Sequence, residues 1–185
     1  MYIGNTIRIL SERLLLRPVQ MEDADSIFTY RSDAVVNQYQ GWIPTTIDDV
    51  HDFITNKVSS EINLPGTWFQ FAIIKTDNNE LIGDIGIHFL PSDAFQVELG
   101  ITLNMDHQGK GYATEALKET IDYLFRELNK HRITASIDPQ NQPSINLFER
   151  LGFRKEAHFR KSLFTNGEWV DDLVYAILKD EWNAK

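Results

Sequence analysis

The sequence predicts a mixed α/β fold built on a central, mostly antiparallel sheet of seven strands. Three observations favour it. The apolar periodicity changes from helical to strand-like over residues 68–103, a glycine-rich loop at residues 107–113 opens a strongly amphipathic helix, and an Asn-Gly pair at residues 166–167 separates two apolar runs. The length of 185 residues, with 42% apolar and 24% charged residues, is typical of one globular domain over residues 1–185.

Each predicted element has a local signal. Thr46 and Asp49 resemble a capping box at the start of a helix, Asn141 is suited to cap the last long helix, and Gly152 is suited to follow its end. The predicted strands are residues 14–19, 68–74, 81–89, 95–103, 132–137, 153–164 and 169–178. The predicted helices are residues 22–31, a helix opened by Thr46, and residues 112–129 and 141–151.

Composition excludes several classes of protein. The chain has no cysteine, so disulfides, thiolate metal sites and a cysteine nucleophile are excluded. A net charge of −9 argues against nucleic-acid binding. A negative charge would suit a cationic substrate, but many proteins carry such a charge for solubility alone. No apolar run approaches the roughly 20 residues of a membrane helix, and the first ten residues lack the pattern of a secretory signal. We therefore expect a cytoplasmic protein.

The glycine-rich loop is a predicted anion cradle. It joins a strand to a helix, whose first N–H groups have no partner within the helix and lie at its positive end. Gly109 and Gly111 let the chain curl so that N–H groups converge on phosphate oxygens, and Lys110 adds positive charge.

Three nucleotide-binding patterns compete for this loop. The P-loop pattern, G-x-x-x-x-G-K-[ST], is not satisfied. Asn104 occupies the position of its first glycine, and Gly111 occupies the position of its serine or threonine. A dinucleotide fingerprint is weak because Thr114 replaces its third glycine and the preceding strands read as antiparallel. The pattern Q/R-x-x-G-x-G/A is satisfied by Gln108, Gly111 and Ala113.

Four blocks in order resemble the GCN5-related N-acetyltransferase (GNAT) superfamily, in particular the branch of the ribosomal-protein N-terminal alanine and serine acetyltransferases. The blocks read SERLLLRP at residues 11–18, ELGI at 98–101 with QGKGYATEAL at 108–117, N-x-x-S at 141–144 with LGF at 151–153, and G-x-W-x-D at 167–171. The resemblance covers nearly the whole chain.

The resemblance implies acetyl-CoA as donor and a primary amine as acceptor. It also implies helices on both faces of the sheet, and a splayed parallel pair, residues 98–103 and 132–137, that binds the pantetheine arm like an added strand. Backbone N–H near Leu103 would polarise the thioester carbonyl. The implied cofactor-binding residues are Leu103, Gln108, Gly109, Lys110, Gly111, Tyr112, Ala113, Thr114, Asn141 and Ser144.

Catalysis requires removal of a proton from the ammonium and protonation of the leaving thiolate. Glu98 is the candidate base, against the alternative of a solvated strand carboxylate; Asp84, Asp138 and Glu168 are less favoured bases. Ser144 is the candidate acid by resemblance, although serine is also common near helix N-termini. Without cysteine, a Cys acyl-enzyme is excluded, so we predict direct attack in a ternary complex.

Other residues receive weaker expectations. The histidines lack ligand spacing, so we predict no metal, and His107, which flanks the loop, is expected to be a loop residue that forms a hydrogen bond. Tyr39 and Trp42 could form a lid over the acceptor or pack on the following helix, and Trp169 and Trp182 are expected in the core or at a sheet edge. The rival functions are an antibiotic or polyamine acetyltransferase and a non-catalytic acyl-CoA-binding module; the terminal hairpin could pair two chains as a homodimer.

Overall fold

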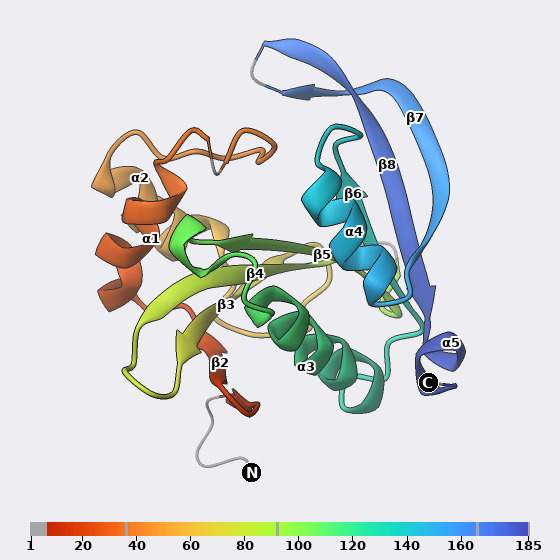
Figure 1. The fold of residues 1–185 in the computed structure, drawn as a ribbon, viewed down its shortest axis with the longest axis horizontal. Helices are drawn as coiled ribbons and strands as arrows, with labels where there is room; N and C mark the ends of the chain where they lie inside the picture. Colours follow the sequence, from red (N-terminus) through yellow and green to blue (C-terminus); the bar gives the residue numbers. More distant parts are fainter. Residues whose placement is uncertain (1–6, 36, 92, 166, 185) are drawn as a thin grey trace.

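The fold is a mixed sheet with helices packed against it (Figure 1). The computed structural model describes residues 7–35, 37–91, 93–165 and 167–184. Within these residues the sheet has eight strands in the order β1-β2-β3-β4-β5-β6-β8-β7. Every neighbouring pair is antiparallel except β5 and β6. The predicted fold class is therefore confirmed, with one strand more than the seven expected.

The strands are β1 (Ile9–Leu10), β2 (Leu14–Pro18), β3 (Trp68–Lys75), β4 (Leu81–Phe89), β5 (Gln96–Leu103), β6 (Arg132–Ile137), β7 (Arg154–Thr165) and β8 (Glu168–Leu178). The α-helices are α1 (Ala24–Arg31), α2 (Ile47–Asp52), α3 (Tyr112–Arg126), α4 (Gln142–Arg150) and α5 (Lys179–Asn183). Shorter helical segments are the 3-10 turns η1 (Met21–Asp23) and η3 (Met105–His107) and the π-helix η2 (Phe53–Lys57).

Three elements differ from the prediction. One is the short helix α5, which follows β8 where no helix was predicted. The additional strand, β1, has only two residues, too few for a periodic pattern, and it forms because the chain folds back on β2. The helix opened by Thr46 ends at Asp52 and continues as a π-helix, so Val58 does not extend its apolar stripe. Val58 instead forms a parallel bridge with Trp68, a tertiary pairing that overrides the local periodicity.

The predicted capping residues are confirmed, although α3 ends at Arg126 and not near residue 129. The Thr46 side chain accepts a hydrogen bond from the Asp49 N–H in a capping box. Asn141 caps α4, and Gly152 follows it in the left-handed region at φ +88°. The ring of Phe153 packs against Phe148 with centroids 5.0 Å apart. Local side-chain chemistry therefore fixes where these helices begin and end.

Helices cover both faces of the sheet, as the family resemblance implied. Asp84 on β4 is bonded to Tyr30 and Arg31 of α1, whereas the next residue, Ile85, belongs to the core that contains the apolar stripe of α3. Successive side chains of a strand point to opposite faces, so α1 and α3 lie on opposite sides. The fully buried stripe residues of α3 are Ala116, Leu117, Ile121, Leu124 and Phe125.

The parallel pair splays in the middle of the sheet. The β5–β6 ladder comprises only Gln96–Arg132, Val97–Ile133 and Glu98–Thr134. Beyond it β5 stays paired with β4 up to Leu103, and β6 stays paired with β8 up to Ile137. The two strands therefore part after Glu98, which confirms the expected splay.

Candidate functional site

The loop between β5 and α3 is built to present backbone N–H groups. Gly109 and Gly111 adopt left-handed conformations at φ +71° and +85°, and α3 begins at the next residue, Tyr112. The side-chain amide of Gln108 donates to the Leu103 carbonyl at 3.0 Å, which ties the loop to the end of β5. The loop thus turns onto the positive end of a 15-residue helix.

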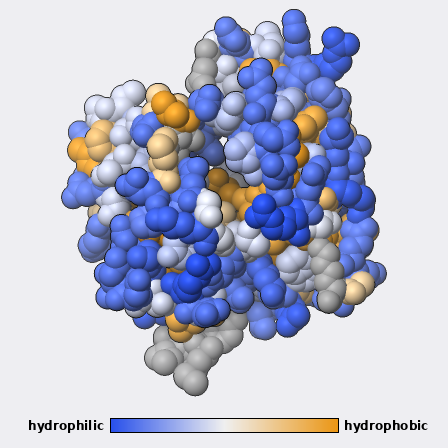
Figure 2. All heavy atoms as spheres, in the orientation of Figure 1, coloured by the Kyte–Doolittle hydropathy of each residue, from blue (hydrophilic) through white to orange (hydrophobic). Residues whose placement is uncertain are grey.

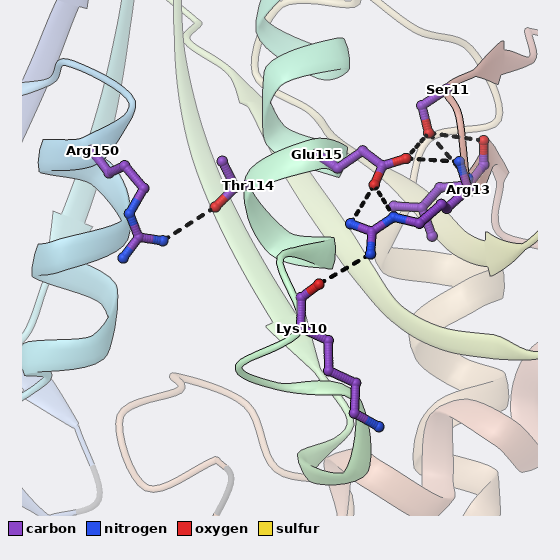
Figure 3. Close-up of polar contacts among 7 residues, drawn as sticks. Ser11, Arg13, Lys110, Thr114, Glu115 and Arg150 are labelled. Atoms are coloured by element: carbon purple, nitrogen blue, oxygen red, sulfur yellow. Dashed lines mark hydrogen bonds and ion pairs between the residues drawn. The ribbon is translucent and has the colours of Figure 1, made fainter.

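The N-terminal segment holds this loop from the side (Figure 3). Arg13 donates from Nη1 to the Lys110 carbonyl at 3.1 Å and from Nε to Glu115 at 2.7 Å, and its guanidinium lies 4.5 Å from the centre of the Tyr112 ring. Ser11 also donates to Glu115, at 2.7 Å. Burial raises the pKa of Glu115, but hydrogen bonds from Ser11 and Arg13 outweigh it and lower that pKa below the ordinary value. The sequence block at residues 11–18 indicated the family, but no local signal gave Arg13 a role.

A hollow of about 580 Å³ lies between this loop and α4; we call it the loop cleft. Figure 2 shows the recess in the middle of this face, with hydrophobic atoms deep inside and hydrophilic atoms around it. The predicted loop residues that line it are Gln108, Gly109, Gly111, Tyr112, Ala113 and Thr114. Leu103, Asn141 and Ser144, also predicted, line it from β5 and α4.

Two cations near the loop cleft have positions that the sequence did not predict. The Lys110 side chain is not among the lining residues, because its ammonium donates to the Asp106 carbonyl at 2.7 Å. Arg150, at the end of α4, does line the cleft and lies 3.5 Å from the Thr114 hydroxyl (Figure 3). An arginine at a helix end carries no sequence signal for this position, because it depends on how α4 packs beside α3.

A second hollow, of about 550 Å³, lies beside the first, where β5 and β6 part; we call it the acidic pocket. Five carboxylates line it, from β5, the β6–α4 connection and β8: Glu98, Asp138, Glu168, Asp171 and Asp172. Burial, and then the charge of Asp172, raises the pKa of Glu98 above its ordinary value. A half-buried carboxylate with a raised pKa suits a general base better than a solvated strand residue.

The other candidate bases differ in their surroundings. Asp84 is 1% exposed and accepts hydrogen bonds from Tyr30, Arg31 and Gln70, so it is a buried structural carboxylate. Asp138 and Glu168 line the acidic pocket, and Asp138 also accepts from the Gln140 N–H at 2.7 Å.

The two hollows meet along residues 38–40. Gln38, Tyr39 and Gln40 line both. Trp42 does not line either hollow; it stacks on Phe53 with ring centroids 4.3 Å apart, which is the packing alternative. Of the two aromatic residues considered as a lid, only Tyr39 is therefore placed at the site.

The remaining expectations concern one histidine and two tryptophans. His107 contacts Glu80 at 3.1 Å, as a loop hydrogen-bonder should. Trp182 is 9% exposed, in the core, whereas Trp169 is 61% exposed and packs at the sheet edge, against Phe164 of the edge strand β7, with ring centroids 5.3 Å apart. The hairpin projects from the sheet, where few residues can cover it (Figure 1). In the described part of the chain no group of three His, Asp or Glu side chains could hold a metal ion, and no described helix is long and apolar enough to span a membrane.

Comparisons with known proteins agree with this geometry. Residues 13–154 match the family model described as an acetyltransferase (GNAT) domain. The N-acetyltransferase p20 of Bacillus licheniformis is 35% identical over 175 residues, 94% of this chain and 97% of that protein. The [ribosomal protein uS5]-alanine N-acetyltransferase of Escherichia coli is 29% identical, over 95% of this chain and 93% of that protein. A GNAT-family acetyltransferase structure from Bacillus anthracis has a TM-score of 0.83 at 32% identity, with 95% and 100% of the two chains covered. The chain belongs to the GNAT acetyltransferase family and is an acyltransferase.

Proposed function

We propose that the protein transfers an acetyl group from acetyl-CoA to a primary amine, on a protein N-terminus or a small molecule, by direct attack in a ternary complex. One observation carries the proposal: the loop cleft and the acidic pocket share residues 38–40 and adjoin along β5. A donor held in one hollow and an acceptor held in the other can therefore meet, which transfer without an acyl-enzyme requires.

The residues of the loop cleft fit acetyl-CoA. The left-handed glycines Gly109 and Gly111 and the first N–H groups of α3 would hold the pyrophosphate, with Arg150 adding positive charge. Beyond Glu98 the edge of β5 that faces β6 has no ladder partner in β6, so it can pair with an extended amide-containing arm. When bound, acetyl-CoA supplies an acyl group activated as a thioester.

The residues around the junction have separate roles in this proposal. Glu98 accepts the ammonium proton, and its raised pKa keeps it basic enough to do so near neutral pH. Backbone N–H near Leu103 stabilises negative charge on the acyl oxygen. Ser144, whose N–H donates to Asn141 in the first turn of α4, lines the loop cleft and in this proposal protonates or orients the leaving thiolate.

The acidic pocket supports a cationic acceptor. Its five carboxylates create a negative potential in a concave site, and such a site concentrates ammonium groups. The relative named for the alanine of ribosomal protein uS5 supports a protein N-terminus as acceptor. The number of carboxylates favours, as the second candidate, a small amine with several charges, such as a polyamine or an aminoglycoside-type antibiotic.

The test is a thiol-release assay. The protein is mixed with acetyl-CoA and either a peptide with an N-terminal alanine, spermidine or an aminoglycoside, and free thiol is measured over time. We expect release with at least one amine, and release at least about 10²-fold slower for Glu98→Gln. Tight acetyl-CoA binding without turnover of any amine, in a broader panel as well, would make the protein an acyl-CoA-binding module instead.

A further inference from the structure

Arg13 contacts the loop between β5 and α3 at both neighbours of Gly111. Its Nη1 donates to the Lys110 carbonyl at 3.1 Å, and its guanidinium lies 4.5 Å from the centre of the Tyr112 ring. Gly111 and Tyr112 line the loop cleft, whereas Arg13 does not. Arg13 and Arg150, which lines the cleft, lie on opposite sides of the start of α3 (Figure 3). Arg13 therefore supports the wall of the cleft from its outer side.

Glu115, in the first turn of α3, fixes the orientation of the Arg13 side chain. Nε and Nη2 of Arg13 lie 2.7 Å and 2.6 Å from the Glu115 carboxylate. The backbone N–H of Arg13 and the hydroxyl of Ser11 also donate to this carboxylate, at 2.8 Å and 2.7 Å. A guanidinium is a rigid planar fork, so holding one edge of it on Glu115 leaves Nη1 directed at the Lys110 carbonyl.

The bond to the Lys110 carbonyl also sets the direction of the next backbone N–H. The peptide bond between Lys110 and Gly111 is trans, as are all peptide bonds in the described part of the chain. The C=O and the N–H of a trans peptide lie in one plane and point in opposite directions. Because the carbonyl is held toward Arg13, the Gly111 N–H points away from Arg13. Among the described residues no backbone carbonyl accepts from this N–H, so it is available to a ligand in the cleft that Gly111 lines.

We propose that Arg13 is a positioning residue for the acetyl donor: by holding the Lys110 carbonyl, it directs the Gly111 N–H toward the pyrophosphate of acetyl-CoA. This inference rests on the proposed function, since the pyrophosphate must lie on this loop. The hydrogen bond from a charged guanidinium also polarises the peptide, which makes its N–H a stronger donor. Arg13 thus acts through the backbone and does not touch the cofactor.

The experiment measures the affinity of Arg13→Ala for two ligands. CoA carries the pyrophosphate and is titrated by calorimetry, whereas pantetheine lacks the pyrophosphate and is titrated by NMR. For Arg13→Ala we expect CoA to bind about 5- to 10-fold more weakly, which corresponds to the net loss of one hydrogen bond, and pantetheine to bind unchanged. The loss of CoA affinity should persist in about 1 M salt, where the charge of Arg13 is screened beyond about 3 Å.

Arg154 is the matched control. Its side chain is 45% exposed, against 43% for Arg13, it pairs with Glu156 and Glu181, and it lines neither hollow. Arg13→Ala and Arg154→Ala should each lower Tm by no more than about 4 °C, and Arg154→Ala should leave the affinity for CoA unchanged.

Three results for Arg13→Ala would overturn the proposal. Unchanged CoA affinity would show that the loop keeps its geometry without Arg13. Equal weakening of CoA and pantetheine would make the role of Arg13 structural, and a loss of CoA affinity that disappears in high salt would make Arg13 a distant charge. Failure of the wild-type protein to bind CoA would instead refute the proposed function.

Discussion

Replacing Gly111 with alanine tests the anion cradle through stability and ligand affinity together. Gly111 has φ +85°, where an L-residue costs about 1–2 kcal/mol. Alanine recovers about 0.4–1 kcal/mol by restricting the unfolded chain. The net backbone effect is therefore about 1 kcal/mol of destabilisation.

The new Cβ also meets Arg13. It would lie 3.3 Å from Nη2, so the guanidinium must move away from its contacts with Lys110 and Glu115. The Arg13 side chain is 43% exposed, so loss of these contacts adds about 0.2–1 kcal/mol. At about 2–4 °C per kcal/mol for a chain of this length, we expect Gly111→Ala to lower Tm by about 2–8 °C.

Gly167 is the matched control, because it has nearly the same backbone angle, φ +84°, and a Cβ there meets nothing within 4 Å. Gly167→Ala should lower Tm by about 2–4 °C and leave CoA affinity unchanged. Gly111→Ala should weaken CoA at least about tenfold, because the pyrophosphate loses its close backbone approach. In an Arg13→Ala background the extra loss of stability at Gly111 should disappear. Thermal unfolding and calorimetric titration measure both quantities, and equal CoA affinities for the two glycine variants would refute the placement of the cradle.

Four further variants separate chemistry from structure. Glu98→Gln should lower kcat about 10²- to 10⁴-fold. Folding raises the pKa of the Glu98 carboxyl. The free energy of unfolding of wild type therefore falls as the pH rises from the unfolded-state pKa of Glu98 to its folded-state pKa. Denaturant titrations should find Glu98→Gln more stable than wild type at pH 8 and equally stable below about pH 4. Asp172→Asn should move the lower apparent pKa of kcat/KM to lower pH, since the charge of Asp172 helps raise the pKa of Glu98; an unmoved profile would separate Asp172 from the base. Ser144→Ala should lower kcat on the order of 10²-fold with little change in the KM for acetyl-CoA, and equal rates would remove Ser144 from the mechanism. Asp84→Asn should cost about 3–5 kcal/mol in urea unfolding, because it leaves the buried charge of Arg31 without its partner.

The sequence predicted well wherever the signal is local. The loop glycines, the caps at Thr46 and Asn141, the stripe of α3 and the terminal hairpin all follow from residues within a few positions of one another. The same local character limited the prediction at β1, which exists only because it pairs with β2.

By itself the sequence determined the family, the glycine-rich loop that opens α3 and the residue types available for catalysis, because each is a property of short-range spacing and composition. The tertiary structure alone decided which of these residues lie together. It placed Glu98 in one pocket with carboxylates 40 to 74 positions later in the sequence, and it held the loop through Arg13. These relations depend on the order of strands in the sheet and on the splay between β5 and β6, and sequence spacing carries no signal for distances across a sheet.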